Sequence, residues 1–218
     1  MAINKTTEVL EIRPIEIQKV NLRIVGDTPL IMHAWSEKAK RMMLEAQMGL
    51  AKGKKKEPKN PVEDFIRSMY WLTDMPEEMT EEAFSAAISN GARFGFPVTA
   101  FKQAAISAAY RMGWAKDKVS LRGAFFIDSD ENGMIEIHSD VPKMREDMVK
   151  VGMGTADIRY RGEFANWYAD MTISYNTNGN YSLENIVNII NAGGYICGVG
   201  EWRPEKDGQY GMFHVATA

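Results

Sequence analysis

The sequence is poor in cysteine and in long apolar runs, and each shortage removes a class of protein. A single cysteine, Cys197, excludes an internal disulfide and a cysteine-rich zinc site. It also favours a reducing compartment, so we expect a cytoplasmic protein. No run of about eighteen apolar residues occurs, so we expect no helix that spans a membrane. With 45% hydrophobic residues among 218, the chain can bury a core of its own, and we expect residues 1–218 to form a single domain.

Common catalytic motifs are missing as well. The sequence contains no HExxH, GxSxG or Walker-type GxxxxGK[ST] motif. Gly198-Val199-Gly200 leads into a charged turn, whereas a dinucleotide-binding glycine motif opens a helix. The three histidines, His33, His138 and His214, are far apart and lie in or beside predicted strands, where a histidine is more often a packed residue than an acid-base group. We therefore expect no catalytic residue and no cofactor.

Acidic residues do gather at one predicted turn, at Asp128, Asp130 and Glu131. Such a group can hold a divalent ion, but turns require these residue types anyway, so we expect no metal site. Two enzymatic alternatives stay open. One is a metal-independent ribonuclease that uses His33 or His214, and the other is a metal-assisted ribonuclease at Asp128 and Asp130.

Charge is unevenly distributed along the chain. The formal net charge is −3, which argues mildly against generic nucleic-acid binding. Residues 36–59, however, hold eight Lys or Arg and only three acidic residues, so the remainder is markedly acidic. Lysine, glycine and proline dominate residues 49–60, which predicts an exposed basic loop. The pattern is typical of one basic surface on an otherwise acidic body.

Hydrophobic periodicity predicts an α+β protein. Alternating residues predict strands at 20–25, 156–163, 167–175 and 210–216, and a hairpin whose strands are 121–127 and 134–138. Helices are expected at about 36–50, 61–72, 80–90, 100–112 and 183–192, with Thr99 and Ser182 as N-caps of the last two. Residues 140–154 read as irregular. The order fits a ferredoxin-like or RRM-like antiparallel sheet with helices on one face. Residues 17–33 and 94–218 would form its core, and residues 36–93 a helical insertion after the first strand, with the basic loop at 49–60.

Glycine is concentrated near the C-terminus, with six glycines from Gly193 to Gly211. Gly193 and Gly194 follow a predicted helix and can act as its C-cap. The later glycines indicate a loop whose backbone amides contact a phosphate chain, with Trp202 to stack on a base and Arg203 to pair with a phosphate. The alternative is a plain loop followed by a tight hairpin with bulges.

Basic and aromatic residues elsewhere add candidate contacts to a nucleic acid. Arg159 and Arg161 are two residues apart on a predicted strand, so their side chains point to the same side of it. Trp35, Trp167 and Trp202 are candidate platforms for stacked bases. The full set of expected nucleic-acid-binding residues is Lys52, Lys54, Lys55, Lys56, Lys102, Arg145, Lys150, Arg159, Arg161, Gly198, Gly200, Trp202, Arg203 and Lys206.

Three segments carry a resemblance to a known family. Residues 198–203 and 208–215, with glycines, Arg203 and a final strand, resemble the C-terminal glycine-rich loop of the CRISPR-associated RAMP superfamily. Residues 20–30 are similar to the first strand of its backbone-type members, and residues 96–105 are similar to the helix start that follows an Ile-Pro-Gly-Ser pattern, although Val98 stands where that glycine is usual. The whole chain also resembles uncharacterised proteins of tailed phages and prophages.

This resemblance implies an RRM-like core that binds single-stranded RNA and polymerises side by side. It also implies a hairpin between the middle strands, for which residues 142–154 match by position, with Lys143, Arg145 and Lys150 on it. Some members cleave RNA with a loop aspartate or a histidine, and Asp27 or His33 would be the nearest candidates.

From these observations we expect a non-catalytic protein that binds single-stranded RNA or DNA and forms a homo-oligomer, as a ring or filament, along its ligand. Besides the ribonucleases, the remaining alternative is a phage-encoded interaction or inhibitor subunit.

Overall fold

The computed structural model describes residues 13–35, 37–50, 58–151 and 154–216. It is a mixed α+β structure in which all described strand pairs are antiparallel. The larger sheet has four strands in the order β4-β8-β1-β9, with bounds Phe125–Ile127, Tyr168–Asn176, Ile17–Gly26 and Phe213–Val215. The central pair runs from Ile17 opposite Asn176 to Val25 opposite Tyr168.

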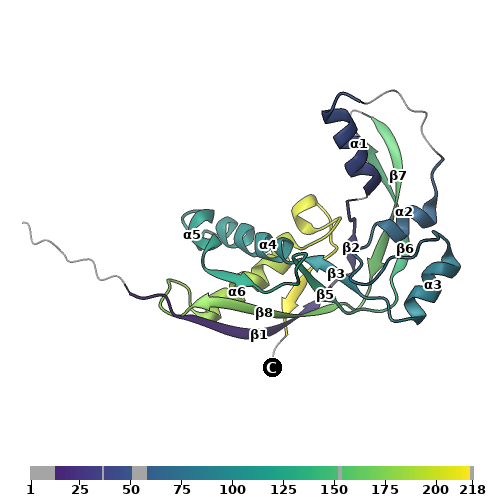
Figure 1. Ribbon diagram of the computed structural model, residues 1–218. Coiled ribbons are helices and arrows are strands. Elements are labelled where there is room, and N and C mark those ends of the chain that lie inside the picture. Colours follow the sequence, from purple (N-terminus) through teal and green to yellow (C-terminus); the bar gives the residue numbers. More distant parts are fainter. Residues whose placement is uncertain (1–12, 36, 51–57, 152–153, 217–218) are drawn as a thin grey trace, which may run out of the picture.

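Helices α4 (Val98–Arg111) and α6 (Leu183–Ala192) cover one face of this sheet (Figure 1). The strand alternation produces this arrangement, because Val20, Leu22 and Ile24 of β1 all point into the core below the helices. The Phe101 ring of α4 lies 5.4 Å from the Phe213 ring and 6.3 Å from the fully buried Trp167 ring. Aromatic contacts of this kind dominate core energetics and fix α4 over the sheet.

A long hairpin, β6 (Lys143–Val151) with β7 (Thr155–Phe164), extends away from the four-stranded sheet (Figure 1). Strand β2 (Leu30–Met32) pairs with the base of β7. Helices α1 (Glu37–Gln47) and α2 (Pro61–Arg67) lie beside the hairpin, and we call β6, β7, α1 and α2 the arm. Near its base, α3 (Glu81–Ser89) packs through Phe84 on Phe65 of α2, with ring centroids 5.0 Å apart. The C-terminal loop lies where the four-stranded sheet with its helices meets the arm (Figure 1).

Several local predictions are confirmed by the caps. Ser182 accepts a hydrogen bond from the Asn185 amide in a reciprocal capping box at the start of α6. Thr80 caps α3, and Asn60 caps α2 with Pro61 at its first position. Thr99, however, lies inside α4, which begins one residue earlier after Pro97 and has no side-chain cap. Pro97 occupies the N-cap position and fixes the backbone before the helix, but it supplies no capping hydrogen bond.

Two other sequence-based predictions are wrong. Residues 140–154, expected to be irregular, contain strand β6, so Arg145 and Lys150 lie on the hairpin. The expected pairing of residues 121–127 with 134–138 does not form. Instead, the shorter β4 pairs with β8, and β5 (Met134–Ile137) pairs with β3 (Phe94–Pro97). The turn at 130–133 does form, but tertiary pairing redirects both of its flanking strands.

Helix α6 ends at Ala192 with Gly193 at its C-cap position, as predicted, and the chain continues through a π-helical turn, η1 (Gly193–Cys197). A side chain at Gly193 would come within 2.7 Å of the Ala105 backbone on α4, and one at Gly194 would collide with the Phe213 carbonyl oxygen. The glycine pair therefore permits close backbone packing between α4, η1 and β9. Among the described residues, no helix is long and apolar enough to cross a membrane.

Candidate functional site

The glycine-rich segment from Gly198 to Gly211, here called the glycine loop, has a tightly determined backbone. Gly198, Gly200 and Gly211 have φ angles of +63°, +79° and +64°, a region that favours glycine. Trp202 and Asp207 also have positive φ, at 52° and 60°. A side chain at Gly211 would collide with the Val199 carbonyl oxygen, so the two ends of the loop touch backbone to backbone.

Most of the loop amides already have partners. The Val199 amide donates to Gly211 O at 2.9 Å, the Glu201 amide donates to Ile31 O at 2.9 Å, and the Gly198 amide donates to Gly193 O at 2.9 Å. The interpretation of the loop as a cradle of free amides for a phosphate chain is therefore wrong for these positions. The loop is fixed to strand β2 through the Glu201 amide, and the amides of Gly198, Val199 and Glu201 are already used within the protein.

Arg203 is held within the loop. Its guanidinium donates to Gly200 O at 3.0 Å and to Glu205 at 3.2 and 3.3 Å. Glu205 also accepts from Arg111 of α4 at 2.8 Å, so a single carboxylate joins two arginines. Trp202 is 37% exposed, so its indole is accessible and does not serve as a core residue. The tryptophan side chain is thus partly accessible at the surface, whereas the arginine has an intramolecular counter-ion.

The hairpin arginines also form an internal network. Arg161 is only 4% exposed, and its guanidinium lies 3.2 Å from Asp147 and 3.3 Å from Glu201 of the glycine loop. Its Nε atom is buried and has no hydrogen-bond partner among the described residues. Arg145 pairs with Asp147 at 2.8 Å and lies over the Tyr210 ring at 4.4 Å. Arg161, expected on a solvent-exposed face, therefore ties the arm to the loop.

The remaining predicted cations are placed differently. Arg159 pairs with Asp157 at 3.0 Å, and Lys102 lies 3.9 Å from the centroid of the Phe126 ring, where burial lowers the pKa of its ammonium group. Lys150 and Lys206 are exposed and make no ion pair with any described residue. The four lysines of the basic loop, Lys52, Lys54, Lys55 and Lys56, lie outside the described residues.

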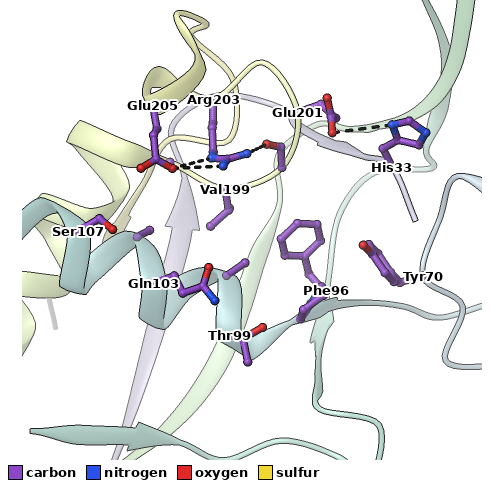
Figure 2. A pocket seen from close by; sticks show the side chains of 15 residues that line it. His33, Tyr70, Phe96, Thr99, Gln103, Ser107, Val199, Glu201, Arg203 and Glu205 are labelled. Carbon is purple, nitrogen blue, oxygen red and sulfur yellow. Dashed lines mark hydrogen bonds and ion pairs between the residues drawn. The ribbon is translucent and has the colours of Figure 1, made fainter. Parts of the chain in front are cut away.

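A pocket of about 370 Å³ lies between α4 and the glycine loop, and we call it the α4–loop pocket. Gly198 and Gly200 form part of its loop wall. Figure 2 shows side chains of the two walls and of one end facing each other across this space. The α4 wall has a polar stripe at helical spacing, and the labelled residues are Thr99, Gln103 and Ser107 from α4, Val199, Glu201, Arg203 and Glu205 from the loop, and His33, Tyr70 and Phe96 at one end.

Two titratable groups at that end are held neutral. Burial, and then the charge of Arg161, lower the pKa of His33. Because a guanidinium only donates, His33 Nδ1 accepts from Arg161 Nη2 at 3.3 Å, and the neutral ring carries its proton on Nε2. Burial, and then the charge of Glu201, raise the pKa of Tyr70. This end of the pocket therefore offers neutral hydrogen-bonding groups and one carboxylate.

The other candidate catalytic residues lie elsewhere. His214 pairs with Asp27 at 2.6 Å on the sheet face opposite the helices. Asp128 pairs with Lys19, and Asp130 accepts amide hydrogen bonds from Asn132 and Met134 in its own turn. Within the described ranges, no group of three His, Cys, Asp or Glu side chains could hold a metal ion.

The uncovered face of the sheet does not present a free aromatic platform at its centre. Tyr168 of β8 lies between the Arg23 guanidinium, 4.5 Å from its ring centroid, and the stacked His138 ring at 4.7 Å. Arg23 in turn forms a bidentate pair with Asp170, at 2.7 and 2.8 Å. The α4–loop pocket is therefore a better candidate site than the sheet face.

Sequence reasoning found the glycine loop but missed the residues opposite it. Tyr70, Phe96 and Gln103 carry no recognisable motif, and only the i, i+4, i+8 spacing of Thr99, Gln103 and Ser107 signals a polar face on an otherwise alanine-rich helix. Comparison of the chain with protein-family models and with curated proteins finds no match.

Proposed function

We propose that this chain binds single-stranded nucleic acid at the α4–loop pocket and assembles in several copies along it. The observation that carries the proposal is the pocket itself, which is lined by aromatic and polar side chains and has Arg203 and Glu205 on its loop wall. Glu205 joins Arg203 to Arg111 of α4, and the exposed Trp202 lies between the lining residues Glu201 and Arg203 in the chain. Single-stranded nucleic acids are bound by this combination of stacking platforms and cations.

A ferredoxin-like core is part of the proposal. The sequence order β1, α4, β4, β8, α6, β9 and the spatial order β9-β1-β8-β4 correspond to a βαββαβ unit with its last strand beside the first. The β6–β7 hairpin is inserted between β4 and β8, the two middle strands of that unit. Its position is the one at which backbone-type RAMP proteins carry a hairpin, and this supports the resemblance.

Exposed apolar surface supports self-assembly. On the arm, Met148 is 77% exposed, and α1 and the residues after it add Met42, Met43, Leu44, Met48 and Leu50. An apolar groove of about 810 Å³ lies between the C-terminal end of α4, α6 and η1, lined by Met112, Trp114, Tyr181, Tyr195 and Ile196 among others. Large exposed apolar patches mark interaction sites.

We assign the groove to the arm of a second copy. The elements that line the groove, namely the C-terminal end of α4 and helix α6, lie toward α5 (Lys118–Arg122) and away from the arm (Figure 1). A contact between two different surfaces is heterologous, so it generates a ring or an open filament rather than a closed dimer. Met148→Glu should abolish self-association, whereas Ile15→Glu, at an equally exposed apolar side chain outside both surfaces, should leave it intact.

Fluorescence anisotropy with labelled single-stranded RNA and DNA tests binding directly. We expect binding at micromolar protein and a moderate salt dependence, because Arg161, Arg145 and Arg159 already have counter-ions. Absence of binding to both ligands at low salt would overturn the proposal. Cleavage of the RNA that His33→Ala abolishes without loss of binding would favour a ribonuclease.

A further inference from the structure

The α4–loop pocket contains polar groups that no protein group uses. The Thr99 hydroxyl, the Gln103 amide and the Tyr70 hydroxyl line it, and within the described part of the chain none of them makes a hydrogen bond. Figure 2 shows Gln103 and Thr99 on the α4 side and Tyr70 across from them, beside Phe96. The pocket therefore offers donors and acceptors to a ligand without breaking any internal bond.

The charged groups at the end of the pocket that holds His33 and Tyr70 discriminate between ligand types. Glu201, the carboxylate beside His33, is 40% exposed at its side chain, whereas Arg161 is 5% exposed and already paired with Asp147 and Glu201. The other carboxylate that lines the pocket, Glu205, lies on the Ser107 side. A phosphate placed here would face a carboxylate without a free cation to balance it. A neutral ring with N–H donors would instead satisfy that carboxylate, which can only accept hydrogen bonds.

Aromatic side chains supply a surface for such a ring. Phe96 is 6% exposed and lines the pocket, and Tyr70 meets it edge to face with centroids 5.6 Å apart. Ligand pockets of about 300–1,000 Å³ accommodate small organic molecules, and the volume of this pocket, about 370 Å³, lies at the lower end of that range. A single heterocycle fits these features better than a peptide or a sugar-phosphate chain.

We propose that the α4–loop pocket binds one unstacked nucleobase that carries an exocyclic amino group, namely adenine, cytosine or guanine. This inference rests on the proposed function, because a single strand would supply the base. Glu201 accepts from the amino group, Gln103 pairs with the adjacent ring edge as donor and acceptor, and the ring lies against Phe96 and Tyr70. Uracil and thymine present carbonyl oxygens where the amino group would be, and these would face the Glu201 carboxylate.

Homopolymeric RNA oligonucleotides of equal length, oligo(A), oligo(C) and oligo(U), test the inference by anisotropy. We expect oligo(A) and oligo(C) to bind about tenfold more tightly than oligo(U), a ratio within the range of one good bidentate base contact. Glu201→Gln should reduce that ratio to about twofold or less, because the carboxylate that disfavours the uracil carbonyl is lost, and Gln103→Ala should weaken the binding of oligo(A) and oligo(C). Gln18→Ala, at an exposed glutamine of β1 outside the pocket, the arm and the groove, is the matched control and should keep the full ratio. Thermal melting confirms that each variant folds.

The outcomes separate this inference from the function on which it rests. If the three oligonucleotides bind equally and Gln103→Ala changes nothing, the base pocket is refuted while nucleic-acid binding stands. If none of them binds, the proposed function fails. Saturation-transfer NMR with adenosine and uridine alone then decides the pocket, since a signal for adenosine that Gln103→Ala removes would support it. The lack of such a signal would overturn it.

Discussion

Replacement of Glu205 by glutamine is the most informative single perturbation of the site. The Glu205 carboxylate accepts from Arg111 at 2.8 Å and from Arg203 at 3.2 Å, so it neutralises part of the charge that a phosphate would otherwise meet. Glutamine has nearly the same shape and keeps hydrogen-bonding atoms without the negative charge. Glu205→Gln should therefore release two guanidinium groups for contacts with phosphates.

The expected magnitudes follow from the exposure of the two pairs. Both are partly exposed, so each contributes about 0.2–1 kcal/mol to stability, and the variant should lose no more than about 2 kcal/mol. Two additional phosphate contacts should steepen the slope of log K against log salt by about 1.4, since each contact to a single strand contributes about 0.7. Affinity at low salt should rise for the same reason.

Anisotropy titrations with oligo(A) from about 50 to 200 mM salt measure the slope, and the steeper slope corresponds to about a sevenfold larger loss of affinity over that range. Glu63→Gln is a matched control, because Glu63 pairs with Arg67 at 2.9 Å on α2 with similar exposure and lies outside the pocket. An unchanged slope in Glu205→Gln, in a protein that still binds, would refute the assignment of Arg203 and Arg111 to phosphates.

Three further predictions concern the loop and the pocket. Trp202→Ala should weaken binding by about 1–3 kcal/mol, as expected for loss of one stacked base, and intact binding would exclude Trp202 as a platform. Because the side chain is only 37% exposed, the melting temperature of the variant must be measured to show that the fold is kept. Gly211→Ala should lower the free energy of unfolding in urea by about 1–2 kcal/mol because of its positive φ, and by about 1–3 kcal/mol more because the new side chain collides with Val199. Gly49→Ala is the control: Gly49 has a φ of +69° and no neighbour within 4 Å, so this variant should show only the loss of about 1–2 kcal/mol. Because the pKa of His33 is lowered in the folded state, the unfolded chain binds the proton more readily. The contribution of His33 to the free energy of unfolding should be fully present above the ordinary pKa of 6.5 and should be lost as the pH falls through the folded pKa. His33→Gln should flatten that decrease in urea titrations between pH 7 and pH 5.

Secondary structure is predicted well from the sequence where it depends on the residues of a single strand or helix. Strand β1 alternates Val20, Leu22 and Ile24 with polar residues, and Ser182 begins α6 as its side-chain chemistry requires. The wrong predictions arise where distant elements compete. The turn between β4 and β5 forms, but these two strands do not pair with each other. Instead, β4 pairs with β8 and β5 pairs with β3.

The site shows the same division. The spacing of Arg159 and Arg161 places them on one side of β7, but it cannot tell whether that side meets solvent or the glycine loop. Asp147 and Glu201, brought in from β6 and from the loop, make Arg161 an internal residue. Gln103, Tyr70 and Phe96 become neighbours only through the packing of α4 beside β3, and no local pattern encodes that contact.

The mass of the protein bound to single-stranded RNA of defined lengths tests the central claim most directly. Light scattering after size-exclusion chromatography should show complexes whose protein content rises by whole copies as the RNA lengthens. A protein that stays monomeric and free of RNA at every length, at micromolar concentration and low salt, would contradict the account.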